Sequence, residues 1–295
     1  MSDSSDNFRG ALFMSISMAG FALNDATIKL VSADLDLYQI IFLRGIFATL
    51  LVGAMAWYRG GLFYLPSRHD TGVMVLRAVG EVGGTLCFLT ALFNMPIANA
   101  TAILQALPLA VTLAAALFLG EKVGWRRYTA ICVGFIGVLI IVRPGGEGFN
   151  AYALWAVAAV GFIVLRDLST RRLSPGIPSA FVALTSSIAI TAVGGVLSLT
   201  VPWQPVSGGS LLLLAGAAGF LFFAYLFAVM TMRVGEVSFV SPFRYSVLIW
   251  AIVLGLVLFG EVPDAWTITG SLIVVGMGIY TFYRERRLVK AAAAA

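Results

Sequence analysis

Residues 237–259 read VSFVSPFRYSVLIWAIVLGLVLF and carry one formal charge, Arg244. An apolar run of 23 residues predicts a helix that crosses a bilayer, which takes about 20 residues. An arginine in such a helix is costly in lipid, so we expect Arg244 to face protein or a water-filled cavity. Ser241, Arg244 and Tyr245 lie at helical spacing and form a polar face, beside Pro242, which removes one backbone donor.

The run ends in Gly260-Glu261, and the same ending occurs 140 residues earlier in the chain. There, Gly120-Glu121 closes an apolar run over residues 95–119. That earlier run also carries a polar stripe and a proline, namely Thr101, Gln105, Thr112 and Pro108. The chain is therefore predicted to hold two copies of one design.

The composition predicts a polytopic membrane protein. Hydrophobic residues make up 60% of the chain and charged residues only 11%, whereas soluble domains carry about 25% charged residues. The only histidine, His69, lies in a polar connection, which excludes most histidine-based catalysis and metal binding. Cys87 and Cys132 both lie within apolar runs and predict neither a disulfide nor a metal site.

Ten apolar runs are predicted to form transmembrane helices, five in each half of the chain. They cover residues 8–28, 37–58, 71–94, 95–119, 127–142, 151–168, 178–201, 209–232, 237–259 and 265–283. The third and fourth runs abut, and residues 94–96 are the predicted turn between them. The connections are short, so no separate soluble domain is expected.

The distribution of lysine and arginine predicts that both termini are cytoplasmic, because cytoplasmic loops carry an excess of these residues. With a cytoplasmic N-terminus, the inner segments hold fourteen basic residues and the outer segments one or two, Arg143 and, near the outer end of a helix, Lys29. The fourteen are Arg9, Arg59, Arg68, Lys122, Arg126, Arg127, Arg166, Arg171, Arg172, Arg233, Arg284, Arg286, Arg287 and Lys290.

An odd number of helices in each half inverts the second half in the membrane. The expected fold is therefore an all-α membrane protein, built as a 5+5 inverted-topology repeat. The repeats cover residues 1–147 and 148–290, followed by a poly-alanine tail at 291–295. The alternative is that the two Gly-Glu endings coincide by chance. Many secondary transporters have this design and bind substrate near the midplane, between the halves.

Charged residues within the runs are the first candidates for a substrate site. On the first helix, Asp25 and Lys29 lie one turn apart, with Asn24 beside them. They form either a structural ion pair or a charged wall of the substrate cavity. Arg44 on the second helix either holds neighbouring helices together or binds a carboxylate or phosphate through its planar fork.

Glu81 lies deep in the third helix, among Gly80, Gly83 and Gly84, which let another backbone approach closely. It is expected either to pair with Arg77 or Arg44 or to serve the substrate. Gln105 belongs to a polar stripe that either bonds neighbouring helices or faces the substrate. The candidate substrate-binding residues are thus Arg244, Tyr245, Arg44, Asp25, Glu81, Gln105, Ser241, Asn24 and Lys29.

Several sequence elements together resemble the drug/metabolite transporter superfamily, in its ten-helix EamA-type branch. In the first half they are Asn24-Asp25 with Lys29, Phe42-Leu43-Arg44, Pro108, residues 118–121 (FLGE) and residues 134–137 (GFIG). In the second half they are residues 242–245 (PFRY) and 259–263 (FGEVP). The first, second and sixth of these elements are similar to the sub-branch that contains S-adenosylmethionine uptake transporters.

This resemblance implies a bacterial inner-membrane carrier, not an enzyme, that moves an amino-acid-like zwitterion such as S-adenosylmethionine by alternating access. Amino-acid exporters and carriers of riboflavin-type vitamins or amphipathic amines are the alternatives within transport, and a channel-like or scaffold membrane protein is the alternative outside it. Arg44 or Arg244 would bind the substrate carboxylate, and Asp25 or Glu81 its cationic part. The partners expected are a small molecule and the lipid bilayer, with a homodimer left open. No cofactor, metal or nucleic acid is expected.

Overall fold

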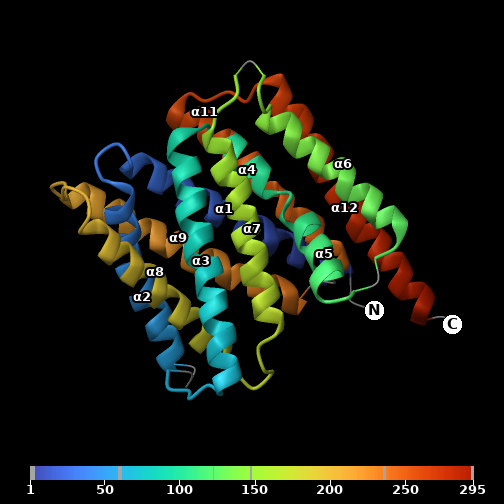
Figure 1. Cartoon of the computed structure of the whole chain (residues 1–295), viewed down its shortest axis with the longest axis horizontal. Helices are drawn as coiled ribbons and strands as arrows, with labels where there is room; N and C mark the ends of the chain where they lie inside the picture. Colours follow the sequence, from blue (N-terminus) through green and yellow to red (C-terminus); the bar gives the residue numbers. More distant parts are fainter. Residues whose placement is uncertain (1–3, 59–61, 122, 147, 235–236, 294–295) are drawn as a thin grey trace.

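The computed structural model describes residues 4–58, 62–121, 123–146, 148–234 and 237–293. Two basic residues of the predicted charge bias, Arg59 and Lys122, lie outside these ranges, as do position 147 and the last two alanines. The described elements run in chain order as α1 (Ser4–Val31), α2 (Leu37–Tyr58), α3 (Arg68–Asn94), α4 (Ile97–Leu104), α5 (Leu107–Phe118), α6 (Trp125–Val142), α7 (Tyr152–Arg171), α8 (Ser179–Ser198), α9 (Gly208–Val234), α10 (Val237–Val240), the 3₁₀ segment η1 (Ser241–Tyr245), α11 (Ser246–Phe259) and α12 (Ala265–Ala293) (Figure 1).

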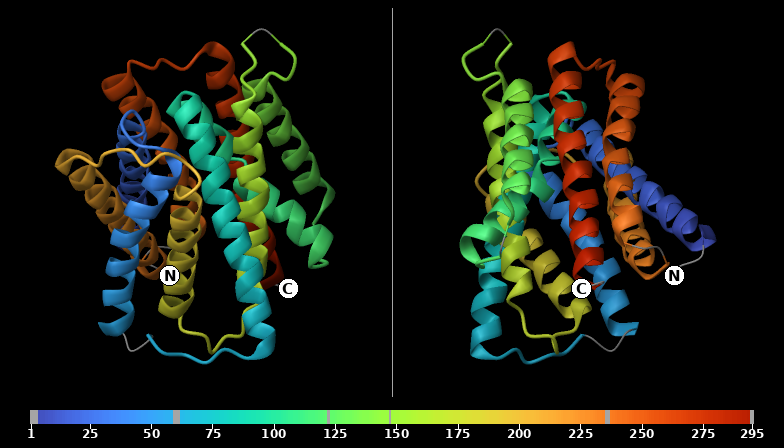
Figure 2. Two further views of the ribbon diagram at one scale, coloured as in Figure 1. Left: turned by 60° about the vertical axis from the view of Figure 1, so that its left-hand side comes forward. Right: turned by 90° about the vertical axis from the view of Figure 1, so that its right-hand side faces the viewer.

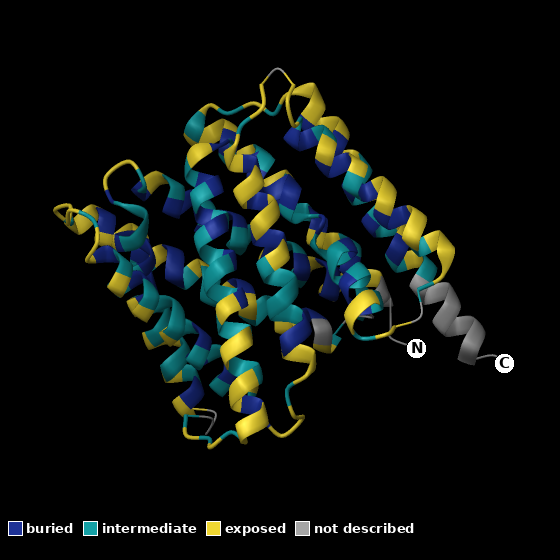
Figure 3. Cartoon of the chain, viewed as in Figure 1, coloured by how far each residue is buried: buried dark blue, intermediate teal, exposed yellow. Residues whose placement is uncertain are grey.

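Ten helical spans within the described residues are long and apolar enough to cross a membrane. Each corresponds to one predicted run, and the turn predicted at residues 94–96 separates α3 from α4. Side chains on the outward faces of the bundle are widely exposed, and many of them are large and apolar (Figure 3). In water such a surface would be a liability, whereas in a bilayer it faces lipid. The chain is a multi-pass membrane protein.

The fourth and ninth spans are broken helices. Gln105 caps the end of α4, and a new helix, α5, follows with Pro108 in its first turn. In the ninth span, η1 carries Pro242 in its first turn, and Tyr245 directly precedes α11. Proline removes a backbone donor and clashes with the preceding turn, which ends one helical segment and favours the start of another. The break after Tyr245 falls 140 residues after the break at Gln105.

The two Gly-Glu endings form the same helix cap. Gly120 has φ +69° and Gly260 has φ +65°, a left-handed conformation that suits glycine. After each glycine, the glutamate backbone N–H bonds a carbonyl one and a half turns back: Glu121 N to Ala115 O at 3.3 Å, and Glu261 N to Gly255 O at 2.9 Å. The shared sequence thus produces a shared local structure.

Helices of the first half pack mainly against helices of the second half. α1 lies along α9, and α7 lies along α3; α2 pairs with α8, and α6 with α12 (Figures 1 and 2). Each half therefore contributes one partner to each of these four main helix pairs.

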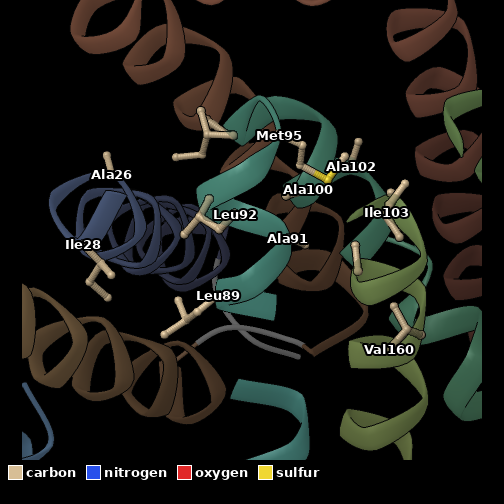
Figure 4. Close-up of a cluster of buried hydrophobic side chains, with 14 of the residues drawn as sticks. Ala26, Ile28, Leu89, Ala91, Leu92, Met95, Ala100, Ala102, Ile103 and Val160 are labelled. Carbon is tan, nitrogen blue, oxygen red and sulfur yellow. The ribbon is translucent and has the colours of Figure 1, made fainter. Parts of the chain in front are cut away.

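The hydrophobic core fills one end of the bundle. We call the end that carries the turn at Gly260-Glu261 the far end, and the end where α1 begins and α12 ends the terminal end (Figure 2). The core gathers residues from the last turns of α1 and α3, from α4 and from the first half of α7, including Ile28, Leu92, Ile103 and Val160 (Figure 4). These segments all lie toward the far end, so that end is packed shut.

Candidate functional site

A polar cavity of about 990 Å³ occupies the bundle between the packed core and the terminal end. Among the described spans, all but α6 contribute to its lining. Thr170 at the end of α7, Ser179 at the start of α8 and Arg233 at the end of α9 all line it, so the cavity extends to the terminal end. Gln105 and Tyr245 place both helix breaks on its wall.

Asn24 links a carboxylate to a guanidinium at the inner wall of this cavity. Its side-chain amide donates to Asp25 Oδ1 at 2.8 Å, and its carbonyl oxygen accepts from Arg44 Nη1 at 3.2 Å. Arg44 is only 8% exposed, and its Nε has no hydrogen-bond partner among the described residues. A buried guanidinium with unused donors is a site that an anionic group can complete.

Glu81 lies between two arginines, and the second one was not predicted as its partner. Arg77 Nη2 lies 3.3 Å from Glu81 Oε2, and Arg166 Nη1 lies 3.3 Å from Glu81 Oε1. Arg166 also bonds Asp167 at 2.8 Å, and Arg77 Nε donates to Thr170 Oγ1 at 2.9 Å. The predicted pair with Arg77 is confirmed, whereas the alternative with Arg44 is not formed. Much of the charge of Glu81 is therefore already neutralised.

The glycines around Glu81 bring α3 against α7, as the sequence predicts. A Cβ on Gly80 would lie 2.7 Å from both Arg166 N and Phe162 O, and one on Gly83 would lie 2.5 Å from the ring of Phe162. Only a residue without a Cβ allows this approach. The close packing is what carries Arg166 to within reach of Glu81.

Arg244 lines the cavity from η1 and makes no hydrogen bond or ion pair with any described residue. Its neighbour Tyr245 also lines the cavity, is 6% exposed and has a hydroxyl without a described partner. That hydroxyl lies against Gly278 of α12, where any Cβ would collide with it. The free cation that the sequence predicts to face protein or water therefore faces the cavity.

Seven of the nine candidate residues line the cavity in the part of the chain that the structure describes: Asn24, Asp25, Arg44, Glu81, Gln105, Arg244 and Tyr245. Ser241 is buried beside the lining. Lys29 is not part of the lining, and it does not pair with Asp25. Its Nζ instead lies 2.6 Å from Glu261 Oε1, 232 residues away in sequence.

Sequence reasoning missed Arg166, Asp167 and Tyr225, which line the same cavity. Arg166 and Asp167 sit inside the run at 151–168, so two adjacent charges within an apolar run were the available signal; Arg166 was counted only as a topological marker. Tyr225 lies in an apolar helix and carries no such signal. No group of three histidine, cysteine, aspartate or glutamate side chains capable of holding a metal ion occurs among the described residues.

The sequence model of the EamA-like transporter family matches residues 8–143 of this chain. The S-adenosylmethionine uptake transporter of Rickettsia felis is 26% identical over 275 residues, which cover 92% of each chain. This chain is a transporter of the EamA family. Its ten spans and its polar cavity are the parts that such a transporter needs.

Other relatives of this EamA transporter carry different names. The pseudopaline exporter CntI of Pseudomonas aeruginosa is 28% identical, over 90% of this chain and 93% of its own. The riboflavin transporter of Vibrio cholerae is 29% identical, over 90% of each chain. A solved crystal structure with 20% identity superposes with a TM-score of 0.63, over 96% of this chain and 99% of its own, which establishes the fold alone.

Proposed function

We propose that this chain is a secondary transporter that moves an amino-acid-like zwitterion across the bacterial inner membrane by alternating access. S-Adenosylmethionine, after which the Rickettsia felis relative is named, is the first example to test. The observation that carries the proposal is the cavity wall. It presents one guanidinium without a described partner, Arg244, and another with an unused Nε, Arg44, together with the carboxylate of Asp25.

The candidate residues divide by charge. Arg44 and Arg244 would bind the substrate carboxylate, because a planar guanidinium can grip it at two points. Asp25 suits the cationic part better than Glu81, since two arginines already flank Glu81. Asn24 holds Asp25 and Arg44 in position, while Gln105 and Tyr245 offer polar contacts at the helix breaks. Ser241 supports η1 from behind the lining.

The helix pairs support an inverted repeat of residues 1–147 and 148–290. An exchange of the halves that matches the five spans in order turns the pair α1–α9 into the pair α7–α3. The same exchange maps α2–α8 and α6–α12 onto themselves. All four pairs are present, and the two helix breaks and the two Gly-Glu caps keep the same offset of 140 residues. Transporters with inverted repeats place broken helices at the substrate site.

The predicted charge bias places the terminal end in the cytoplasm. In that orientation the cavity opens inward, and the packed core at the far end separates it from the outside. An inward-open cavity with a closed outer end is one of the two states that alternating access requires.

A binding panel on the purified protein tests the substrate class. Thermal unfolding is followed with S-adenosylmethionine, single amino acids, riboflavin and an amphipathic amine, in wild type and in Arg244→Ala. A ligand that binds the folded state raises its melting temperature. We expect a zwitterion to raise the melting temperature of wild type but not of Arg244→Ala. A rise produced by riboflavin or by the amine alone would instead favour the vitamin or amine carrier.

A further inference from the structure

Lys29 and Glu261 form a compact cluster of charge-assisted hydrogen bonds at the far end. Lys29 Nζ donates to Glu261 Oε1 at 2.6 Å and to the carbonyl oxygen of Met95 at 2.7 Å. The other carboxylate oxygen, Oε2, accepts from the backbone N–H of Ile97 at 2.8 Å. The side chains of Lys29 and Glu261 are only 10% and 21% exposed.

This cluster joins three parts of the chain that are distant in sequence. Lys29 belongs to α1, Met95 and Ile97 flank the turn between α3 and α4, and Glu261 follows α11. The N–H of Ile97 has no partner inside its own helix, so the carboxylate both satisfies it and favours the positive end of α4. The ring of Phe259 covers the ammonium at 5.1 Å. Charge-assisted bonds shielded in this way are stronger than exposed ones.

The corresponding position at the terminal end is arranged differently. Glu121 stands 140 residues before Glu261, and its carboxylate bonds Arg171 of α7 at 2.8 Å. Those side chains are 52% and 48% exposed, so this pair faces solvent. At the far end α4 packs against α11, whereas the described residues show no comparable packing between α5 and α10 at the terminal end. The two broken helices thus meet at one end and splay at the other.

We propose that Lys29 and Glu261 are the residues that seal the outer end of the transport cavity, and that they separate in each transport cycle. We call these two side chains, with the backbone of Met95 and Ile97, the outer seal. The inference rests on the proposed alternating access and assigns Lys29 to the seal instead of to the substrate contacts. Opening the far end requires α4 to leave α11, and the outer seal is the polar contact that holds this junction together.

Accessibility of a cavity cysteine tests the outer seal without any substrate. Ala48 lines the cavity, so Ala48→Cys is made in a background with Cys87→Ala and Cys132→Ala. A membrane-impermeant maleimide is applied to right-side-out and to inside-out vesicles, and the labelling rates are compared. The test variant is Glu261→Gln. The control is Asp264→Asn, which removes the charge of an ion pair with Arg143 at the same end but leaves the outer seal intact.

Glu261→Gln should raise the labelling rate from outside by about tenfold or more and lower the rate from inside, because loss of a charge-assisted bond and a stranded ammonium disfavour the closed outer end. Asp264→Asn should leave both rates near those of the parent. An outside rate for Glu261→Gln equal to that of the parent, in folded protein, would overturn the outer seal.

A second variant covers the case in which Glu261→Gln does not fold. Lys29→Gln removes the same ion pair from the α1 side, and it should also raise the outside rate. An unchanged outside rate in folded Lys29→Gln overturns the inference equally. The proposed function fails separately: if the parent cysteine is never labelled from outside, and wild type shows no substrate counterflow, alternating access itself is wrong. Intact counterflow with an unresponsive seal rejects the seal alone.

Discussion

Arg244 is the residue on which the proposed substrate contact depends most. Its guanidinium lines the cavity and has no partner among the described residues, so its removal strands no buried counter-charge. We expect Arg244→Lys to lose substrate binding almost as completely as Arg244→Ala, because lysine keeps the charge but loses the planar two-point fork. Melting temperatures and binding isotherms on the same samples check this. A folded Arg244→Ala protein with wild-type affinity would refute the assignment.

Glu81 should matter for stability in a way that Arg244 does not. Its carboxylate is 15% exposed and pairs with Arg77 and Arg166. Glu81→Gln leaves both arginines short of a counter-charge, and we expect a loss of about 2–3 kcal/mol, somewhat less than for a fully buried pair. Glu121→Gln is the control, because its 52% exposed pair should contribute about 0–1 kcal/mol. Unfolding in detergent measures both variants, and equal losses would contradict the buried network.

Individual charges could be found from the sequence, but their partners could not. Arg44, Glu81 and Arg244 are conspicuous because each interrupts an apolar run. Lys29 was also conspicuous, yet its partner Glu261 lies 232 residues away and is brought close only by the packing of α4 against α11. Spacing along one helix suggested Asp25 instead. Pairing by helical spacing finds only neighbours on the same helix.

At the scale of elements, Gly80 determines how closely α3 and α7 approach. A Cβ at this position would lie 2.7 Å from backbone atoms of α7, and backbone cannot move aside as a side-chain tip can. Gly80→Ala should therefore destabilise the protein by about 1–3 kcal/mol despite the better helix propensity of alanine. Gly72→Ala on the same helix meets nothing within 4 Å and should be neutral or slightly stabilising. Thermal unfolding compares the two variants, and equal stability would show that α3 and α7 have room to spare.

The apolar runs predicted the ten spans, but they did not predict how two of the spans are built. Pro108 and Pro242 marked the fourth and ninth runs as unusual, and the structure breaks both spans there. That the ninth span contains a 3₁₀ segment, η1, depends on how Tyr245 fits against Gly278 of α12. Such a contact between spans leaves no trace in hydrophobic periodicity.

For the whole molecule, the charge bias predicts the orientation in the membrane. Fourteen basic residues in the inner segments against one or two in the outer segments place both termini in the cytoplasm. A C-terminal fusion to a reporter that is active only in the cytoplasm should be active, and a fusion to a periplasmic reporter should be silent. The opposite result would remove the inverted repeat and would place the packed far end on the cytoplasmic side.

Which end of the bundle is closed could not be predicted from the sequence. Both halves carry the same Gly-Glu cap and the same kind of broken helix, so the sequence pattern favours neither end. The closed end depends on which of two similar junctions is packed, and that is a property of one conformational state. The core at the far end and the exposed Glu121 identify the state described here.

Solute counterflow in proteoliposomes tests the central claim most directly. Labelled S-adenosylmethionine, or the zwitterion that the binding panel identifies, is added outside vesicles loaded with the same unlabelled compound. A carrier with one alternately exposed cavity returns to the outside faster when loaded, so we predict transient accumulation of label for wild type and none for Arg244→Ala. Label that enters at the same rate with or without internal compound would instead indicate a pore and would contradict the account.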